Sequence, residues 1–426
     1  MREILTTTAA EAGRTTRFVQ RASPLSGATF SQTLVLGFLG NPQATLEELT
    51  QTAAAVGVEM SPQALEQRLT ASAAAGLPQV LLTARAQGIT AEPVAIPLVE
   101  RFTAVDVQDS ATISLPEVFA AQWHGGGGSL SSSASAALKL QARVERRPGR
   151  LDVQLQEDRA SDRAASLPGP LPAGALRLAD WGSWSREACA ALEPHKGFWL
   201  SRLQMQSAVY DATGARQELL TLLETQPTDT VDLAVALGER QRLASRLLAV
   251  RVPQDVAETR RRRVRAAARD KGRQGSATRL ALAAGHIFVT NVPVERLTWR
   301  AVWVLGRLRW QLALLCKLWT SQGRVDESRS TKPWRILGEG YAKRLAMLVQ
   351  HGVFLVSFWA SPDRSLTKAA QTVQNHALHL ASAFTSVQRW GRALLTVKRC
   401  LAAGCRMNRR KKHPNTYQLL LQAIGP

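Results

Sequence analysis

Residues 306–320 read GRLRWQLALLCKLWT and are the most informative stretch of this chain. Leucines recur at helical spacing around Trp310 and Trp319, a pattern typical of a helix with one buried face. The sequence therefore predicts a long helix over residues 299–320, with both tryptophans in the core rather than stacked on nucleic-acid bases. This segment carries several basic side chains but no carboxylate at any position.

Two predicted strands upstream of this helix each reach an aspartate. Residues 102–108 alternate apolar and polar side chains and end on Asp109, and residues 175–180 form a short buried strand that ends in Asp180. A later strand, over residues 286–291, ends in a turn before the long helix. Strand ends in an α/β sheet open onto one edge, so carboxylates that are distant in sequence can converge there.

These segments resemble those of insertion-sequence family 4 DDE transposases. The signature helix of that family reads Tyr, two residues, Arg, three residues, Glu, six residues, Lys, and the corresponding positions here are Gly306, Arg309, Ala313 and Thr320. Further segments resemble the family in the expected order, at 108–116, 179–182, 288–293, 332–335 and 415–418. The resemblance covers about residues 30–425.

The resemblance implies an α/β fold: an RNase H-like catalytic core with a β-rich insertion, flanked by helical N-terminal and C-terminal regions. It implies catalytic and metal-binding roles for Asp109 and Asp180, and a catalytic, DNA-contacting role for Arg309. Three carboxylates would hold two Mg²⁺ (or Mn²⁺) ions, one activating the attacking water or 3′-hydroxyl and the other stabilising the leaving oxygen. The implied partner is double-stranded DNA, both the terminal inverted repeats of an element and its target, bound by a homodimer.

The third carboxylate of that arrangement is missing, because its position holds Ala313. The nearest acid in sequence is Asp326, thirteen residues later, which on a continued helix would lie ~20 Å away along the axis. Mg²⁺–oxygen contacts need ~2 Å, so no side-chain rearrangement bridges that gap. We therefore expect no useful cutting or joining of DNA, with Ala313→Glu as the necessary repair and Gly306→Tyr and Thr320→Lys adding to it.

The charge of the chain predicts a polyanionic partner. It has 54 Lys and Arg against 33 Asp and Glu, a net charge of +21 over 426 residues. Neutralising nucleic-acid phosphates releases condensed counterions, which favours binding. A run of arginines is either the solvated face of a helix or a phosphate contact, and the shortage of acids favours phosphate contact. The predicted contacts are Arg260, Arg261, Arg262, Arg263, Arg265, Arg309 and Lys317.

A helical pattern near the N-terminus is compatible with a helix-turn-helix. Thr45 and Glu48 form a capping box at the start of one predicted helix, and Gly57 lies where a tight turn would fall. Ser61 and the following proline then begin a second helix. Glutamine and arginine in its first turns could read adenine and guanine edges, although many small helical domains share this pattern. The candidate base-reading residues are Gln63, Gln67 and Arg68.

We therefore divide the chain into a helical, DNA-binding region (1–95), two parts of the core (96–204 and 256–330), a β-rich insertion between them (205–255) and a helical, basic C-terminal region (331–426). The longest apolar run, residues 345–360, is too short to span a bilayer, and we expect it to form a buried helix. No signal peptide is recognisable. The expectation is a protein of the bacterial cytoplasm, associated with the nucleoid and not with a membrane.

Two functions remain open. One is a DNA transposase of a bacterial insertion sequence, which binds terminal inverted repeats and performs metal-dependent strand cleavage and transfer. The other is a non-catalytic DNA-binding relic or domesticated repressor. The resemblance favours the first as a class of protein, and the lost carboxylate favours the second as present activity. A basic RNA-associated scaffold ranks last, because the chain has no aromatic RNA-binding motif.

Overall fold

The computed structural model describes residues 1–86, 97–114, 116–120, 137–145, 150–157, 171–179, 186–270, 272–358, 363–409 and 418–419. The chain divides into two compact units. The first comprises residues 1–95, 110–167 and 311–417, and the second comprises residues 96–109, 168–310 and 418–426. Strand β1 (Val105–Ser114) and helix α11 (Trp299–Ser321) each run from one unit into the other.

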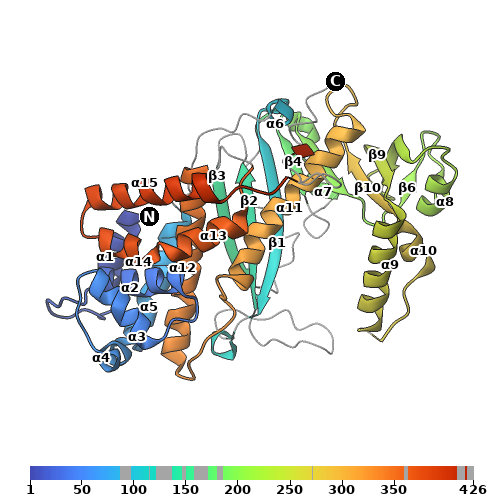
Figure 1. Ribbon diagram of the computed structural model, residues 1–426. Coiled ribbons are helices and arrows are strands. Elements are labelled where there is room, and N and C mark those ends of the chain that lie inside the picture. The colour runs from blue at the N-terminus through green and yellow to red at the C-terminus, as the bar shows by residue number, and fades with distance from the viewer. Residues whose placement is uncertain are drawn as a thin grey trace. The chain divides into compact units, whose positions relative to one another are not determined.

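The second unit is built on a mixed sheet whose first part is parallel. β1 pairs with β4 (Leu176–Ala179), and β4 pairs with β5 (Phe198–Arg202), all in the same direction. β10 (Gly285–Thr290) then lies antiparallel beside β5. Figure 1 labels β1, β4 and β10 among the strands of this sheet. The mixed α/β class predicted from the sequence is confirmed. β1 begins and ends later than predicted, so Asp109 lies within the strand rather than at its end.

The sheet continues with antiparallel strands supplied by residues 205–255. β9 (Leu243–Arg251) pairs with β10, and β8 (Thr230–Leu237) pairs with β9 over its whole length. β6 (Val209–Tyr210) and β7 (Arg216–Gln217) complete this end. Buried side chains of these strands form one core with β5 and β10, among them Trp199, Leu237, Leu247 and Val289. The other helices of this unit are α6 (Pro97–Glu100), α7 (Arg186–Ala190), η3 (Glu193–His195), α8 (Leu219–Glu224), α9 (Gln254–Arg269) and α10 (Ala277–Leu282).

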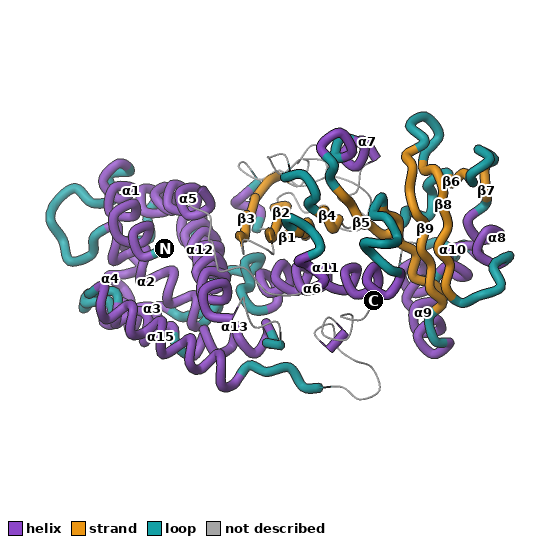
Figure 2. Tube along the Cα trace, turned by 90° about the horizontal axis from the view of Figure 1, so that it is seen from above, coloured by secondary structure: helices purple, strands orange, loops and turns teal. Residues whose placement is uncertain are grey.

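The first unit is mainly helical, and its centre joins segments from the two ends of the chain. α2 (Gly27–Gly40) packs along α12 (Pro333–Phe358), as the tube in Figure 2 also shows. Both helices bury most of their side chains, and the buried side chains of α2 include the polar Ser31, Gln32 and Thr33. Around them lie η1 (Ile4–Thr8), α1 (Ala9–Thr15), α3 (Leu46–Ala55), α4 (Pro62–Arg68), α5 (Ala71–Ala86), α13 (Leu366–Asn375), α14 (Ala377–Ala383) and α15 (Val387–Gly404).

Several local predictions for the first unit are confirmed. Thr45 and Glu48 form a reciprocal capping box, and the Ser61 hydroxyl accepts a hydrogen bond from the Ala64 amide at the start of α4. β2 (Ala137–Glu145) and β3 (Arg150–Glu157) pair antiparallel over the length of both strands. The 3-10 helix η2 (Glu117–Phe119) completes this unit. None of the helices described in either unit has the length and apolarity needed to cross a membrane.

Candidate catalytic and nucleic-acid-binding residues

The predicted long helix is confirmed as α11, Trp299–Ser321. Its backbone carries Arg309 and Ala313, whose side chains lie outside the described part of the structure. Gly306 packs against the ring of Phe288 in β10, where an added Cβ would lie 2.5 Å from Cε1. The structure therefore does not favour Gly306→Tyr as an addition to a repaired site, because the buried ring of Phe288 already occupies that space. Lys317 is exposed.

Arg246 of β9 fixes the segment that leads into α11. Its guanidinium donates to the carbonyl oxygens of Val292 and Leu297, at 2.7 and 3.1 Å. The same side chain forms an ion pair with Asp232 of β8. A half-buried arginine thus joins two strands of residues 205–255 to the beginning of the signature helix, a role that nothing in the sequence signalled.

The segment 288–293, which resembles the family, has a clear structural role. Thr290 donates its hydroxyl to the Trp199 carbonyl, and the Asn291 amide donates to the Gly197 carbonyl at 3.1 Å. The side-chain oxygen of Asn291 also accepts a hydrogen bond from the backbone amide of Trp199, at 2.8 Å. These bonds fasten the end of β10 to the beginning of β5, so the turn before α11 has a defined geometry.

Of the two aspartates of the predicted site, Asp109 lies in a described strand. Asp109 contributes its backbone to β1, and Asp180 lies outside the described residues, directly after β4. The strands themselves are neighbours, and residues paired between them lie 71 positions apart, as Asp106 and Arg177 do. Asp106 is fully buried and forms an ion pair with Arg177 at 3.0 Å. We therefore assign Asp106 a structural role, in which its ion pair with Arg177 links β1 to β4.

Asp326 does not lie on α11. α11 ends at Ser321, and Arg324 then adopts a left-handed conformation with a φ of 42°. Burial raises the pKa of the Asp326 carboxyl above its usual range. The distance between positions 313 and 326 that was calculated for a continued helix therefore does not apply. Asp326 lies in the segment that follows α11.

The arginine run lies on α9, and its members have different surroundings. Arg260 donates to the Gly285 carbonyl at 3.2 Å and contacts His286, while Arg261 donates to the Leu280 carbonyl at 3.2 Å. Burial, and secondarily the charge of Arg263, lowers the pKa of Arg260. Arg260 and Arg261 thus hold α10 and β10 against α9, and their guanidinium groups are already engaged.

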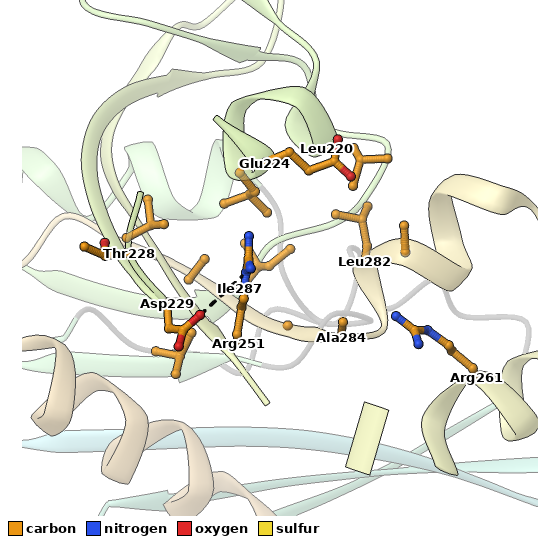
Figure 3. A pocket seen from close by; sticks show the side chains of 15 residues that line it. Leu220, Glu224, Thr228, Asp229, Arg251, Arg261, Leu282, Ala284 and Ile287 are labelled. Atoms are coloured by element: carbon orange, nitrogen blue, oxygen red, sulfur yellow. Dashed lines mark ion pairs between the residues drawn. The ribbon is translucent and has the colours of Figure 1, made fainter. Parts of the chain in front are cut away.

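Arg261 also borders a pocket of about 320 Å³ in the second unit. Figure 3 shows Arg261 at one side of this pocket, Leu220 and Leu282 among its apolar walls, and the ion pair of Arg251 with Asp229 at another side. The two charges of that pair are 3.9 Å apart and exposed to solvent. Among the described residues that line this pocket, Arg261 is the one predicted site residue.

The other arginines of α9 point to solvent. Arg262, Arg265 and Arg269 are exposed and recur at intervals of three and four residues, which places them on one face of the helix. Arg263 is exposed next to this face. In the part of the chain that the structure describes, none of these four forms an ion pair. We call Arg262, Arg265 and Arg269 the arginine stripe.

The structure separates the three residues proposed to read bases. Gln63 and Gln67 are exposed on one face of α4. Arg68 instead lies over the ring of Phe18, 4.7 Å from its centroid, and donates to the Phe18 carbonyl. The connection of α3 to α4, residues 56–61, is longer than the ~3–4 residues of a compact helix-turn-helix. Gly57 adopts a φ of 92° within it.

α4 is also fastened to the start of α12. Glu66 pairs with Lys332 at 2.8 Å and lies 3.8 Å from Arg335. Both basic residues belong to the segment 332–335, whose resemblance to the family therefore coincides with a structural contact. Among the described residues, no group of three or more His, Cys, Asp or Glu side chains could hold a metal ion.

Comparison with known proteins finds distant similarity to transposases. The chain is 22% identical to the transposase for insertion sequence element IS231F of Bacillus thuringiensis subsp. israelensis, over 97% of this chain and 91% of that protein. It is 21% identical to the IS231B transposase of subsp. berliner, over 96% and 90%. The IS1151 transposase of Clostridium perfringens is 21% identical over 60% of this chain and 58% of that protein. No family model matches the chain.

Proposed function

Because the chain is a homologue of insertion-sequence transposases, we propose that it binds duplex DNA, namely the terminal inverted repeats of an element and its target. We further propose that it no longer cuts or joins DNA. The observation that carries DNA binding is the arginine stripe: Arg262, Arg265 and Arg269 are exposed on one helix face, without carboxylate partners among the described residues. The net charge of +21 acts in the same direction.

The length of the stripe suits a DNA backbone. Arg262 and Arg269 are seven positions apart, which is ~10 Å along a helix at ~1.5 Å per residue. Phosphates of one strand recur every ~3.4 Å along the duplex axis, so the stripe spans about three phosphate intervals of one strand. Arg260 and Arg261 are not part of this contact, because their guanidinium groups bind backbone carbonyls. Lys317 and Arg309 remain proposed contacts on α11.

Sequence-specific recognition is proposed for α4. Gln63 and Gln67 are exposed, and an Asn or Gln side chain can bind an adenine edge bidentately. Arg68 would position α4 through its contact with Phe18 rather than read a base itself. We also propose that the protein binds paired ends as a homodimer and associates with the nucleoid through its basic surface.

The catalytic core is proposed to be RNase H-like but incomplete. Residues paired between β1 and β4 lie 71 positions apart, and Asp180 follows Asp109 by the same 71 positions. This equal spacing supports the proposal that the two acids belong to one site. The donor set nevertheless does not fit the two-metal site of the family. Two aspartates supply carboxylates, whereas Ala313 has no oxygen in its side chain and no residue of α11 carries a third carboxylate. Mg²⁺ and Mn²⁺ binding is therefore proposed to be too weak for cleavage.

The test is quantitative DNA binding as a function of salt. With ~6–10 phosphate contacts, affinity for a duplex should fall roughly 10³–10⁵-fold between ~50 and ~200 mM salt. Replacing Arg262, Arg265 and Arg269 by Gln should lower the slope by two to three, at about 1 per lost phosphate. The mass of the complex distinguishes a dimer from a monomer. A flat salt response of the unmodified protein contradicts DNA binding, and Mg²⁺-dependent nicking contradicts the proposed loss of cleavage.

A further inference from the structure

A second basic feature lies beside the arginine stripe, where the chain reverses direction at the end of α9. The amide of Gly272 donates to the Arg269 carbonyl, and the amide of Arg273 donates to the Ala268 carbonyl, both at 2.8 Å. This is the hydrogen-bond pattern of a Schellman motif, and Gly272 supplies the required left-handed conformation with a φ of 63°. The segment that follows therefore returns alongside the helix.

The returning segment is held in place by contacts at its far end. Arg261 of α9 donates to the carbonyl of Leu280, which lies in α10. A Cβ built on Gly275 would lie 3.8 Å from side-chain atoms of Val264 and Leu280, an ordinary packing distance. The space between α9 and residues 273–279 is thus bounded by anchored elements, and its shape exists before any ligand binds.

This space is a groove of about 430 Å³ with basic walls and an apolar floor. Arg263 contributes from α9, Arg273 from the turn and Arg279 from α10, and none of the described residues that line the groove has a carboxylate. The floor consists of Val264, Ala267 and Ala268. In the described part of the chain the three arginines form no ion pair. Three like charges around an apolar floor repel one another and favour an anion between them.

We propose that this groove binds a single phosphodiester of the DNA backbone, clamped jointly by Arg263, Arg273 and Arg279. The inference rests on the proposed DNA binding and adds a defined phosphate site to it. The side chains of Ala267 and Ala268 are small and keep the groove open beside the three arginines that line it. An exposed stripe contacts phosphates one by one, whereas this groove would hold one phosphate with several donors, which fixes the register of α9 on the duplex.

The joint clamp predicts non-additive variants. Arg263→Gln, Arg273→Gln and Arg279→Gln, singly and together, are compared in the full-length protein by the slope of log Kd against log salt. If one phosphate is bound, the triple variant should lower the slope by about 1, no more than a double variant does. Arg240→Gln removes the same charge from an exposed turn of the second unit and should leave the slope nearly unchanged. A loss of about 3 in the triple variant would mean separate contacts and would overturn the clamp.

A charge-neutral pair of variants tests the groove independently. Ala267→Leu places bulk on the floor, whereas Ala266→Leu places the same bulk on an exposed position of α9 that does not line the groove. Both keep helix propensity nearly constant. The first should lower the slope by about 1 and the second should not. If Ala267→Leu leaves the slope unchanged while the unmodified protein shows salt-dependent binding, the groove is refuted and the proposed function stands. If the unmodified protein itself shows no salt-dependent binding, the proposed function is refuted. If Ala267→Leu loses binding of inorganic phosphate but keeps the slope of DNA affinity against salt, the groove is a site for free anions, and the inference is overturned.

Discussion

Gly306 of α11 lies directly against the ring of Phe288 in β10. An added Cβ at position 306 would stand 2.5 Å from Cε1 and 2.6 Å from Cζ of that ring, distances that no real Cβ contact sustains. Phe288 is buried and its backbone pairs with both β5 and β9, so its ring cannot leave without disturbing three strands. The absence of a side chain at 306 therefore allows the helix to approach the sheet closely.

We expect Gly306→Ala to destabilise the protein. The overlap with Phe288 should cost about 1–3 kcal/mol, more than the ~1 kcal/mol that alanine gains over glycine in a helix. Urea unfolding measures the difference. Gly391→Ala is the matched control, since Gly391 lies in α15 with no atom within 4 Å of its built Cβ, and this variant should be stabilised by up to ~1 kcal/mol.

A second variant distinguishes this contact from a general effect of position 306. Phe288→Leu replaces the aromatic ring by a smaller aliphatic side chain, and the double variant with Gly306→Ala should lose less stability than the two single variants together. Strict additivity of the two changes would show that the residues do not compete for the same space.

The features that sequence reasoning predicted here are local ones. The capping box of Thr45 and Glu48 and the helix containing Trp310 and Trp319 depend on side chains a few positions apart, which their spacing reveals. The packing of α2 on α12 joins residues some three hundred positions apart, and no periodicity encodes which apolar helix meets which. The two ends of the chain were therefore predicted as separate regions.

The candidate site shows the same limit. Charge patterning identified the arginine run, but it could not separate Arg260 and Arg261, which bind backbone carbonyls, from the exposed stripe. The groove was missed because Arg263 and Arg279 approach one another only through the chain reversal at Gly272. A glycine thirteen positions before β10 carries no signal for that reversal without the hydrogen bonds that close it.

Replacing Gln63 and Gln67 by Ala should reduce discrimination between element ends and unrelated duplexes. Each lost bidentate contact costs about 1–3 kcal/mol of specificity, while the salt slope should stay the same because no phosphate contact is removed. Competition binding with the two duplexes measures the ratio. Gln51→Ala, an exposed glutamine of α3, is the control. An unchanged ratio in the double variant would move recognition away from α4. Deleting residues 1–95 is unsuitable, because α2 packs against α12.

Stability should fall in mild acid because of His351. Its side chain is buried beside Trp319 and Phe354, and within the described residues neither ring nitrogen has a hydrogen-bond partner. Burial lowers its pKa from 6.5 to about 4. The unfolded chain therefore takes up a proton between these values while the folded protein does not, so stability present above pH 6.5 is lost as the pH falls toward 4.

The size of that loss is about 3 kcal/mol, at roughly 1.4 kcal/mol for each unit of pKa difference. His351→Leu should remove this part of the pH dependence, which urea unfolding at pH ~4.5 and ~7 would measure. His195→Leu, at an exposed position of the second unit, should retain it. Equal pH dependence of the unmodified protein and His351→Leu would contradict a neutral buried imidazole.

Ala313→Glu should restore weak Mg²⁺- or Mn²⁺-dependent nicking of end-containing DNA. Position 313 is the one that the family resemblance assigns to the third carboxylate, and α11 supplies no other acid. A metal-stabilised transition state gains several kcal/mol, so nicking should rise by roughly 10²-fold or more over the unmodified protein. Ala313→Gln has nearly the same shape without the charge and should remain inactive.

The accessory changes should then behave differently from one another. Thr320 lies at the end of α11, half-exposed, and Thr320→Lys can place a cation there without displacing a buried group. We expect it to increase nicking by Ala313→Glu. Gly306→Tyr should lower both stability and nicking, because its side chain meets the Phe288 ring. Asp109→Ala in the repaired protein should abolish nicking. If the unmodified protein nicks DNA and Asp109→Ala abolishes that activity, another group completes the site, and Ala313 is not the reason for any loss.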